Sequence, residues 1–439
     1  MASAALISLG CEKNLVNSEQ MLWMLSEAGF EICQPENADV VIVNTCGFID
    51  SAKSEAIDNI LALDAMRKKG CGFKIIVTGC LAQRYPDEIF SELPEVDGIV
   101  GCGSFDSIVE AARAALDGER PCYMGSLSAP VSETPRPVTT PLWYSYLRIA
   151  EGCDNYCAYC VIPYLRGPYR SRKMEDILNE ARSLAQSGTK ELIVIAQDVT
   201  RYGKDLTGGE DLPALLEKLC EIEGIEWIRL HYLYPDEFTP RLLDVMAGQQ
   251  KILPYFDIPL QHINDTILKR MNRRSSKTQI ETLLRTIRQK LPEAVIRTSI
   301  ICGLPGESEM EFEELCDFLK EFRLQRAGFF VFSPEEGTPA AEMPDQVPRE
   351  TAEERVSILQ QLQDGIMVHY NESRVGSVMR VICDGYDEDR GEYYGRTAAD
   401  SPTVDEQVYF TSEEPVQPGD IIDFRAEYLR DGELAGTRV

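Results

Sequence analysis

Three cysteines stand close together in the run Glu-Gly-Cys153-Asp-Asn-Tyr-Cys157-Ala-Tyr-Cys160, with the spacing C-x-x-x-C-x-x-C. Three thiolates at this spacing can hold one face of a cubane iron–sulfur cluster, which normally takes four thiolates. One iron is then left open, and an open coordination position distinguishes a catalytic metal centre from a closed structural one. A structural zinc site would need a fourth Cys or His nearby, and none follows closely. Ordinary core cysteines are the remaining alternative, and three cysteines within eight residues argue against it.

A second set of cysteines is spread along the sequence but occupies equivalent positions. Cys11, Cys46 and Cys80 each come just after a short apolar run: Leu-Ile-Ser-Leu-Gly, Val-Val-Ile-Val-Asn-Thr and Ile-Ile-Val-Thr-Gly. If these runs are parallel strands, the three thiols meet at the carboxyl edge of one sheet, where open α/β sheets bind ligands. Scattered core cysteines are the alternative, and Cys102, which also follows an apolar run, competes as a ligand. The other cysteines are interpreted as ordinary thiols; they are Cys33, Cys71, Cys122, Cys220, Cys302, Cys316 and Cys383.

The elements that must position these cysteines follow an α/β pattern. Residues 1–118 alternate buried-strand runs with helical segments, such as one predicted over 18–28 and ended by Gly29, so a parallel sheet with flanking helices is expected. The Pro-rich stretch 119–141 predicts a linker. The strand runs expected in the first domain are 5–9, 40–43, 75–77 and 98–100.

The rest of the chain predicts two further domains. Residues 142–370 hold six strand candidates with helical segments between most of them, which indicates a curved, partial (βα)6 barrel of the TIM type. A helix is expected over 349–372, and residues 371–439 read as a small all-β module. The six strand candidates of the barrel are 145–149, 191–196, 227–231, 255–258, 295–301 and 328–332.

The composition excludes several classes of protein. The 439 residues include 44 Lys and Arg against 72 Asp and Glu, a net charge of −28. This charge argues against a broad nucleic-acid footprint and favours a basic partner, with solubility alone as the alternative. Fourteen cysteines without a secretion signal favour thiols and metal ligation in the cytoplasm. No run of 18 apolar residues predicts a membrane span.

Beyond these patterns, the chain resembles the methylthiotransferase family of radical S-adenosylmethionine enzymes over essentially its whole length. The family's motifs are matched at residues 8–14, 44–48 and 78–81, and in the cysteine run with the Ile-Pro-x-x-Arg-Gly-x-x-Arg-Ser-Arg sequence of residues 162–172. Tyr159, just before the third clustered cysteine, also fits. Residues 229–235 and 251–262 are most similar to the branch of the family that modifies protein S-twelve of the small ribosomal subunit.

The resemblance implies two [4Fe–4S] clusters, an auxiliary one on Cys11, Cys46 and Cys80 and a radical one on Cys153, Cys157 and Cys160. It further implies two uses of S-adenosylmethionine, transfer of a methylthio group to the β-carbon of an aspartate, an electron donor such as flavodoxin or ferredoxin, and a C-terminal TRAM domain. Cofactor contacts are expected at the carboxyl edge of the barrel. Arg166 has a structural alternative as a brace of the cluster loop, and His262 as a satisfied core histidine. The candidate contacts are Arg166, Gln197, His231, Gln261, His262, Gly303 and Glu307.

Two rival functions stay open. A tRNA methylthiotransferase would share the architecture and chemistry, but its C-terminal module should carry a basic face. Residues 374–439 instead carry 15 Asp and Glu, 7 Arg and no Lys, a net charge of −8. A basic ribosomal protein is therefore the expected partner, and stable tRNA binding is not expected. A non-catalytic iron–sulfur carrier is the second rival, and it predicts no cleavage of S-adenosylmethionine.

Overall fold

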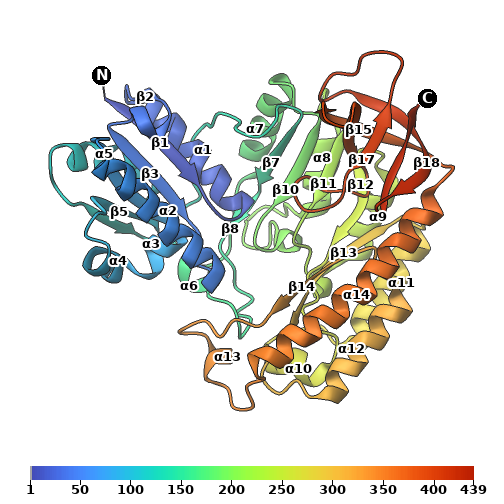
Figure 1. The fold of residues 1–439 in the computed structure, drawn as a ribbon. Coiled ribbons are helices and arrows are strands. Elements are labelled where there is room, and N and C mark those ends of the chain that lie inside the picture. Colours follow the sequence, from blue (N-terminus) through green and yellow to red (C-terminus); the bar gives the residue numbers. More distant parts are fainter. Residues whose placement is uncertain (1) are drawn as a thin grey trace.

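The computed structural model describes residues 2–439, which form three parts in chain order (Figure 1). The N-terminal part, drawn in blue, is a sheet between helices; the central part is a half-open barrel; and the C-terminal part, drawn in red, is a small closed barrel. Among these residues, no helix combines the length and the apolar composition needed to cross a bilayer.

The N-terminal sheet has six parallel strands in the order β2-β1-β3-β4-β5-β6. Every residue of β3 is buried because helices cover both faces of the sheet, which explains its continuous apolar run. Helices α1 and α5 pack on one face, and α2, α3 and α4 on the other. The strands are β1 (Ser3–Ser8), β2 (Glu31–Ile32), β3 (Val40–Thr45), β4 (Lys74–Gly79), β5 (Gly98–Gly103) and β6 (Cys122–Gly125). The helices are α1 (Glu12–Glu27), α2 (Asp50–Lys68), α3 (Cys80–Arg84), α4 (Pro86–Glu92) and α5 (Ile108–Leu116).

Helix α1 begins earlier than the sequence pattern predicts, at Glu12 instead of residue 18. Its first turns bury polar side chains, among them Asn14 and Asn17, so the apolar periodicity that marks a helix is missing there. The Nδ2 of Asn14 donates hydrogen bonds of 3.0 Å to the carbonyl oxygens of Leu9 and Thr45. The predicted end is confirmed, since Gly29 follows the last turn with a φ of +87°.

The segment 119–141 ties the first two domains together. Its strand β6 extends the N-terminal sheet beside β5. Arg136 then lies buried between the domains, where it pairs with Glu19 of α1 and donates a 2.8 Å hydrogen bond to Glu180 of the central domain. The Pro-rich sequence predicted neither feature, because neither a short edge strand nor a buried ion pair produces a strong pattern in the local sequence.

The central sheet has six parallel strands in the order β14-β13-β12-β11-β10-β7, and β7 and β14 are left as edges. The expected partial barrel is confirmed. Its helices begin at clear signals: Ser276 with Gln279 before α11 and Ser308 with Glu311 before α12 form capping boxes. The strands are β7 (Tyr144–Arg148), β10 (Glu191–Ile195), β11 (Trp227–Leu230), β12 (Ile252–Asp257), β13 (Val295–Cys302) and β14 (Arg326–Val331). The helices are α6 (Ile162–Arg166), α7 (Met174–Gln186), α8 (Leu212–Cys220), α9 (Pro240–Gly248), α10 (Asp265–Arg270), α11 (Lys277–Lys290), α12 (Glu309–Phe322), α13 (Pro339–Glu342) and α14 (Arg349–Arg374).

The C-terminal module is a closed five-stranded barrel in the order β15-β16-β17-β19-β18. Its all-β character is as expected from the sequence. The strands are β15 (Val378–Asp387), β16 (Glu392–Thr397), β17 (Val408–Thr411), β18 (Ile421–Arg430) and β19 (Glu433–Arg438).

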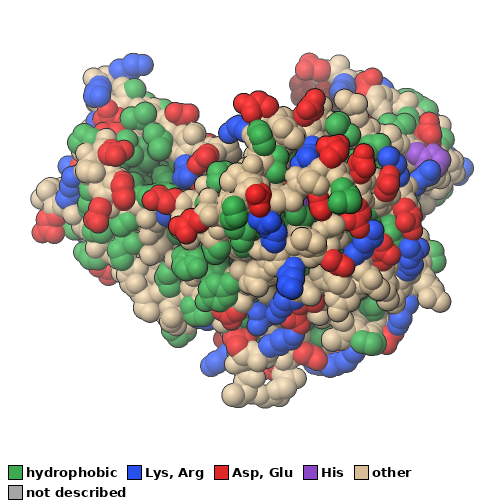
Figure 2. Space-filling view, turned by 90° about the horizontal axis from the view of Figure 1, so that it is seen from below, with side chains coloured by type: hydrophobic (Ala, Val, Ile, Leu, Met, Phe, Trp, Pro, Cys, Tyr) green, Lys and Arg blue, Asp and Glu red, His purple; other side chains and the backbone are tan. Residues whose placement is uncertain are grey.

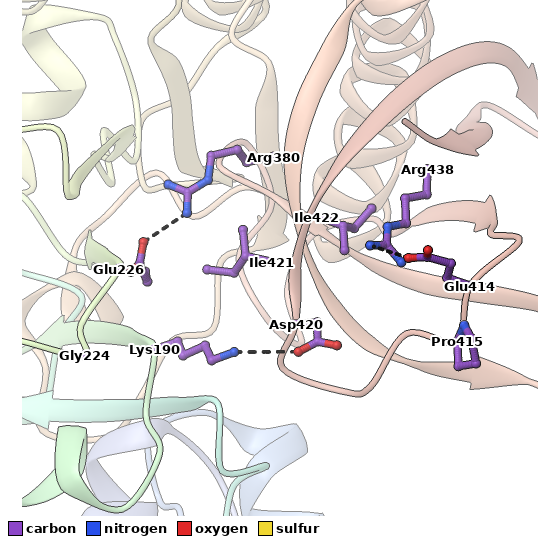
Figure 3. Close-up of a pocket in the computed structure, with 10 residues that line it drawn as sticks. All are labelled: Lys190, Gly224, Glu226, Arg380, Glu414, Pro415, Asp420, Ile421, Ile422 and Arg438. Atoms are coloured by element: carbon purple, nitrogen blue, oxygen red, sulfur yellow. Dashed lines mark hydrogen bonds and ion pairs between the residues drawn. The ribbon is translucent and has the colours of Figure 1, made fainter.

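Buried ion pairs join this module to the central barrel. Glu191 of β10 accepts from Arg229 at 2.8 Å and from Arg396 of β16 at 2.6 Å, and all three side chains are buried. A pocket of about 610 Å³ lies at the junction between the two domains (Figure 3). There the pairs Arg380–Glu226, at 3.0 Å, and Lys190–Asp420, at 4.0 Å, span the two domains.

Candidate metal and cofactor site

The loop that carries Cys153, Cys157 and Cys160 is held at its base by a short antiparallel pair, β8 (Ala150–Glu151) with β9 (Arg170–Ser171). Gly152 adopts a φ of +78°, and a Cβ there would lie 2.0 Å from the carbonyl oxygen of Pro168, so only glycine fits. Within the loop, Cys160 N donates to Cys157 O at 3.0 Å, and Cys153 N donates to Gly167 O at 3.1 Å. The backbone thus gathers the three thiols on one side of the barrel's carboxyl edge.

The chemistry of these thiols suits an iron–sulfur cluster. Burial raises the pKa of Cys153 to about 12 and also raises the pKa of Cys160. Buried thiolates therefore need a positive partner, and a metal that binds them supplies one. Across residues 2–439, no three or more His, Cys, Asp or Glu side chains, these thiols included, are arranged to hold a single metal ion. The preference for a cubane with an open iron over a closed zinc site therefore rests on the number and spacing of the three cysteines.

The second cysteine set gathers at the carboxyl edge of the N-terminal sheet. Cys11 is the N-cap of α1 after β1, Cys46 follows β3, and Cys80 opens α3 after β4. These strands are neighbours in the sheet. The chain goes from β1 outward to β2 on one side and from β3 to β4 on the other, so the connections diverge between β1 and β3, and ligands of such sheets bind where the connections diverge in this way. A Cβ on Gly10 would lie 2.7 Å from the Cβ of Cys46, so glycine permits this approach.

The pKa values of these thiols reflect both burial and one another's charge. Burial raises the pKa of Cys46 to about 11, and the charges of Cys80 and Cys11 add to the rise. Cys102, at the end of β5, packs against Cys80. A hydrogen bond with Cys102 lowers the pKa of Cys80 to about 6, with help from the charge of Arg166. The structure thus places a fourth thiol beside Cys80, at the flank of the three.

Arg166, at the end of α6, connects the two cysteine sets. Its Nη1 donates to Asn17 Oδ1 at 2.9 Å and to Glu151 Oε2 at 3.4 Å, and its Nη2 donates to Asn14. Its charge reaches Cys80, Cys102 and Cys11. Arg166 therefore sits between the N-terminal sheet edge and the base of the Cys153 loop.

Glu151 is a site residue that the sequence did not reveal. Burial alone would raise the pKa of its carboxyl group, but Arg166 and Arg148 lower it to about 2. Gln197 donates to it through Nε2 at 2.8 Å. The Oε1 of Gln197 is buried and has no hydrogen-bond partner among the described residues, so it can accept from a bound molecule. Only its position two residues before Cys153 could have indicated from the sequence that Glu151 belongs to the site.

Gly303, Glu307 and His262 form a second polar group beyond β12 and β13. Glu307 accepts from Gly303 N at 3.0 Å and from Arg355 Nη1 at 2.8 Å. Burial lowers the pKa of His262 to about 4, so the ring is neutral near pH 7. Its Nδ1 accepts from Asn264 N at 3.0 Å, which leaves Nε2 as the protonated nitrogen. That Nε2 is buried, lies 3.7 Å from Glu307 Oε2 and has no hydrogen-bond partner in the described chain.

His231 and Gln261 lie at the same edge of the barrel but have different surroundings. His231 Nε2 is 2.9 Å from Ser401 Oγ of the segment after β16, so this ring faces the C-terminal module. Gln261 adopts a φ of +69°, and its backbone pairs with Ser299 and Ile301. The structure therefore groups Arg166 with Gln197 and His262 with Glu307, and it places His231 apart from both pairs.

The N-terminal domain closes over this edge close to Cys11. Tyr232 Oη donates to Glu12 Oε2 at 2.9 Å, and Lys13 Nζ lies 3.3 Å from the centroid of the Tyr232 ring. Tyr232 is in the left-handed region with a φ of +60°. Such backbone strain in a non-glycine residue is typical of functional sites. Tyr232 thus joins the barrel edge to the first turn of α1, next to Cys11.

Three protein-family models match the chain, one on each part. Residues 3–101 match "Uncharacterized protein family UPF0004", residues 147–319 match the radical SAM superfamily, and residues 375–439 match the TRAM domain. The middle match covers both the cysteine loop and most of the barrel, and the expected TRAM module is confirmed.

Solved structures with a similar fold are radical S-adenosylmethionine enzymes. The methyltransferase TsrM from Kitasatospora setae, solved with cobalamin and a [4Fe–4S] cluster bound, gives a TM-score of 0.57 at 14% identity, with 77% of each chain covered. The enzyme OxsB, solved with aqua-cobalamin and S-adenosylmethionine, gives 0.53 at 12% identity over 83% of this chain and 56% of that chain. At these identities the likeness concerns the fold.

Relatives in sequence cover nearly the whole chain. The ribosomal protein uS12 methylthiotransferase RimO of Acetivibrio thermocellus is 46% identical over 98% of this chain and 97% of its own. The protein of the same name from Pelotomaculum thermopropionicum is 49% identical over 94% of both. The resemblance seen in the cysteine motifs thus extends through all three domains, and the chain belongs to the RimO family of radical S-adenosylmethionine methylthiotransferases.

Proposed function

We propose that this enzyme attaches a methylthio group to the β-carbon of an aspartate in ribosomal protein uS12, using two [4Fe–4S] clusters and two molecules of S-adenosylmethionine. The observation that carries the proposal is the arrangement of two three-cysteine sets on either side of Arg166 and Glu151. The names of the near-full-length relatives support the choice of substrate.

In this proposal Cys153, Cys157 and Cys160 hold the radical cluster, and Cys11, Cys46 and Cys80 hold the auxiliary one. When bound, the clusters and S-adenosylmethionine supply the radical that activates a carbon–hydrogen bond and the methylated sulfur that replaces the hydrogen. The chain's own residues orient the reactants and exclude water. The hydrogen bond of 2.9 Å from Tyr232 to Glu12 supports the exclusion of water, because it joins the barrel edge to the N-terminal domain.

The predicted cofactor contacts remain proposals that differ in their support. Gln197 Oε1 and His262 Nε2 are buried polar atoms without partners in the described residues. Gln197 Oε1 can therefore accept a hydrogen bond from a ligand, and His262 Nε2 can donate one to it. Gln261 can contribute from its strained position in the segment that follows β12. Arg166, His231, Gly303 and Glu307 have protein partners, so we propose that they act at the rim of the cofactor site or hold its walls.

Charge supports a basic protein as the partner. In Figure 2 acidic side chains are scattered over the face in view, and the whole chain carries a charge of −28. Some acids of the C-terminal module are already used: Asp400 pairs with Arg326 at 2.7 Å, and both side chains are buried. The turn between β15 and β16 carries Asp387, Glu388 and Asp389 and is a better candidate surface, with Asp387 paired, among the described residues, only to its neighbour Arg390 at 3.6 Å. A low-potential flavodoxin or ferredoxin as electron donor and a cytoplasmic location go with this proposal.

The partner is tested by comparing binding of the purified enzyme to uS12 and to bulk tRNA at matched ionic strength. We expect tighter binding to uS12, weakening as salt rises. Changing Asp387, Glu388 and Asp389 together to Lys should lower affinity for uS12 without changing cofactor cleavage. Tighter binding to tRNA would favour the rival tRNA methylthiotransferase.

The activity is tested by mass spectrometry. Reconstituted enzyme, S-adenosylmethionine, a reductant and recombinant uS12 are incubated without oxygen, and a methylthio addition to one aspartate is expected. The Cys157→Ala variant should give no product, and Cys122→Ala, which changes a cysteine exposed on β6, should act like the wild type. Unmodified uS12 together with a modified tRNA would overturn the proposal.

A further inference from the structure

The sulfur of Cys157 has two polar neighbours that the proposed function leaves unused. Tyr234 Oη lies 3.1 Å from Cys157 Sγ, and Arg273 Nη1 donates to the same sulfur over 3.8 Å. Both neighbours are nearly enclosed, with exposed fractions of 6% for Tyr234 and 7% for Arg273. The guanidinium of Arg273 also lies over the Tyr234 ring, 4.0 Å from its centroid.

The backbone fixes both side chains at this sulfur. Tyr234 comes just after β11, at the carboxyl edge of the barrel, and its N–H donates to Thr200 Oγ1 at 3.1 Å. Arg273 is anchored through Nη2, which donates to Pro259 O at 2.6 Å. The hydroxyl and the positive charge are therefore positioned by the fold, and a buried phenol needs a polar partner.

We propose that Tyr234 is a positioning residue that donates a hydrogen bond to Cys157 Sγ and thereby raises the reduction potential of the cluster on Cys153, Cys157 and Cys160. The inference rests on the proposed function, which makes Cys157 a cluster ligand. A ligating thiolate has no proton, so the phenol must be the donor. Hydrogen bonds to cluster sulfurs and nearby positive charge stabilise the reduced, more negative state. Arg273 adds such a charge at the same sulfur.

The test uses a protein with a single cluster. In the Cys11/Cys46/Cys80→Ala background, Tyr234→Phe removes only the hydroxyl and keeps the ring under Arg273. An anaerobic redox titration followed by electron paramagnetic resonance should show a shift to lower potential at unchanged iron content. Replacement of Tyr234 by 3-fluorotyrosine, a stronger donor of the same shape, should shift the potential upward.

Tyr202→Phe is the matched control. Tyr202 is also buried in the same domain, and its hydroxyl donates to Arg172 O at 3.0 Å and not to a cysteine sulfur. This variant loses a comparable hydrogen bond and should leave the potential unchanged. An unchanged potential in Tyr234→Phe, or an equal shift in Tyr202→Phe, would overturn the inference alone. A background variant that binds no cluster would overturn the ligand assignment, and this inference with it.

Discussion

The loop that carries Cys153, Cys157 and Cys160 and the sheet edge that carries Cys11, Cys46 and Cys80 bring three thiols together in different ways. The loop set needs one backbone conformation, pinned by the β8–β9 pair. The sheet-edge set needs three neighbouring strands, β1, β3 and β4, in correct register at once. The comparison teaches that one three-thiol site can be specified by a local loop, whereas another depends on the cooperative fold of a whole domain.

The neighbours of the thiols differ too. Cys157 faces a phenol and Arg273, while Cys80 faces another thiol, Cys102, and the charge of Arg166. In both places an arginine lies near a buried sulfur. The hydroxyl of Tyr234 at the loop set is a stronger hydrogen-bond donor than the thiol of Cys102 at the sheet-edge set.

The largest effect is expected at the loop. Cys157→Ala should abolish the formation of deoxyadenosine from S-adenosylmethionine, because the radical cluster needs all three thiolates. Chromatography of anaerobic reactions measures it. The Cys153/Cys157/Cys160→Ala protein should still bind about one cluster by iron and sulfide analysis. Continued cofactor cleavage in either variant would show that the loop is not the radical site.

The reciprocal change at the sheet edge should separate the two sites. Cys46→Ala should block methylthio transfer to uS12, while deoxyadenosine formation partly survives because the loop cluster is intact. The two products are measured in the same reaction by mass spectrometry and chromatography. Normal transfer in Cys46→Ala would remove this cysteine from the ligand set.

A backbone change should disturb the sheet-edge set alone. Gly10 and Gly29 both have a φ of +87°, but a Cβ at Gly10 would meet Cys46 at 2.7 Å, whereas nothing lies within 4 Å at Gly29. Each Gly→Ala change should lower the free energy of unfolding by about 1–2 kcal/mol through backbone strain. Only Gly10→Ala should also lower the iron content of the Cys153/Cys157/Cys160→Ala protein. Equal iron in the two variants would contradict the role given to Gly10.

The smallest effect is expected at Cys102. Cys102→Ala should leave both cofactor cleavage and methylthio transfer close to wild type, since Cys102 lies at the flank of the three proposed ligands and packs against Cys80. Iron analysis and product yield measure this, with Cys33→Ala as a control on the same sheet. A dead Cys102→Ala enzyme would make Cys102 a ligand and revise the sheet-edge set.

The sequence by itself determined the features that rest on local chemistry. The spacing of Cys153, Cys157 and Cys160 predicts a metal-binding loop without any knowledge of the fold. Continuous apolar runs predicted the buried strands, such as β3, because strands covered on both faces have no polar side. Gly29 marked the end of α1 because its φ of +87° suits glycine. The partial barrel and the final β module followed from such runs and their turns.

Only the tertiary structure decided which distant groups meet. The sequence predicted that Cys11, Cys46 and Cys80 follow parallel strands, but only the sheet order and register showed that these strands are direct neighbours. The early start of α1 was hidden because its first turns bury asparagines and not apolar residues. Tyr234 reached Cys157, and His231 turned to Ser401, through contacts between segments far apart in the chain. Such contacts depend on side-chain direction at the carboxyl edge of a folded barrel, which a linear pattern of residue types does not record.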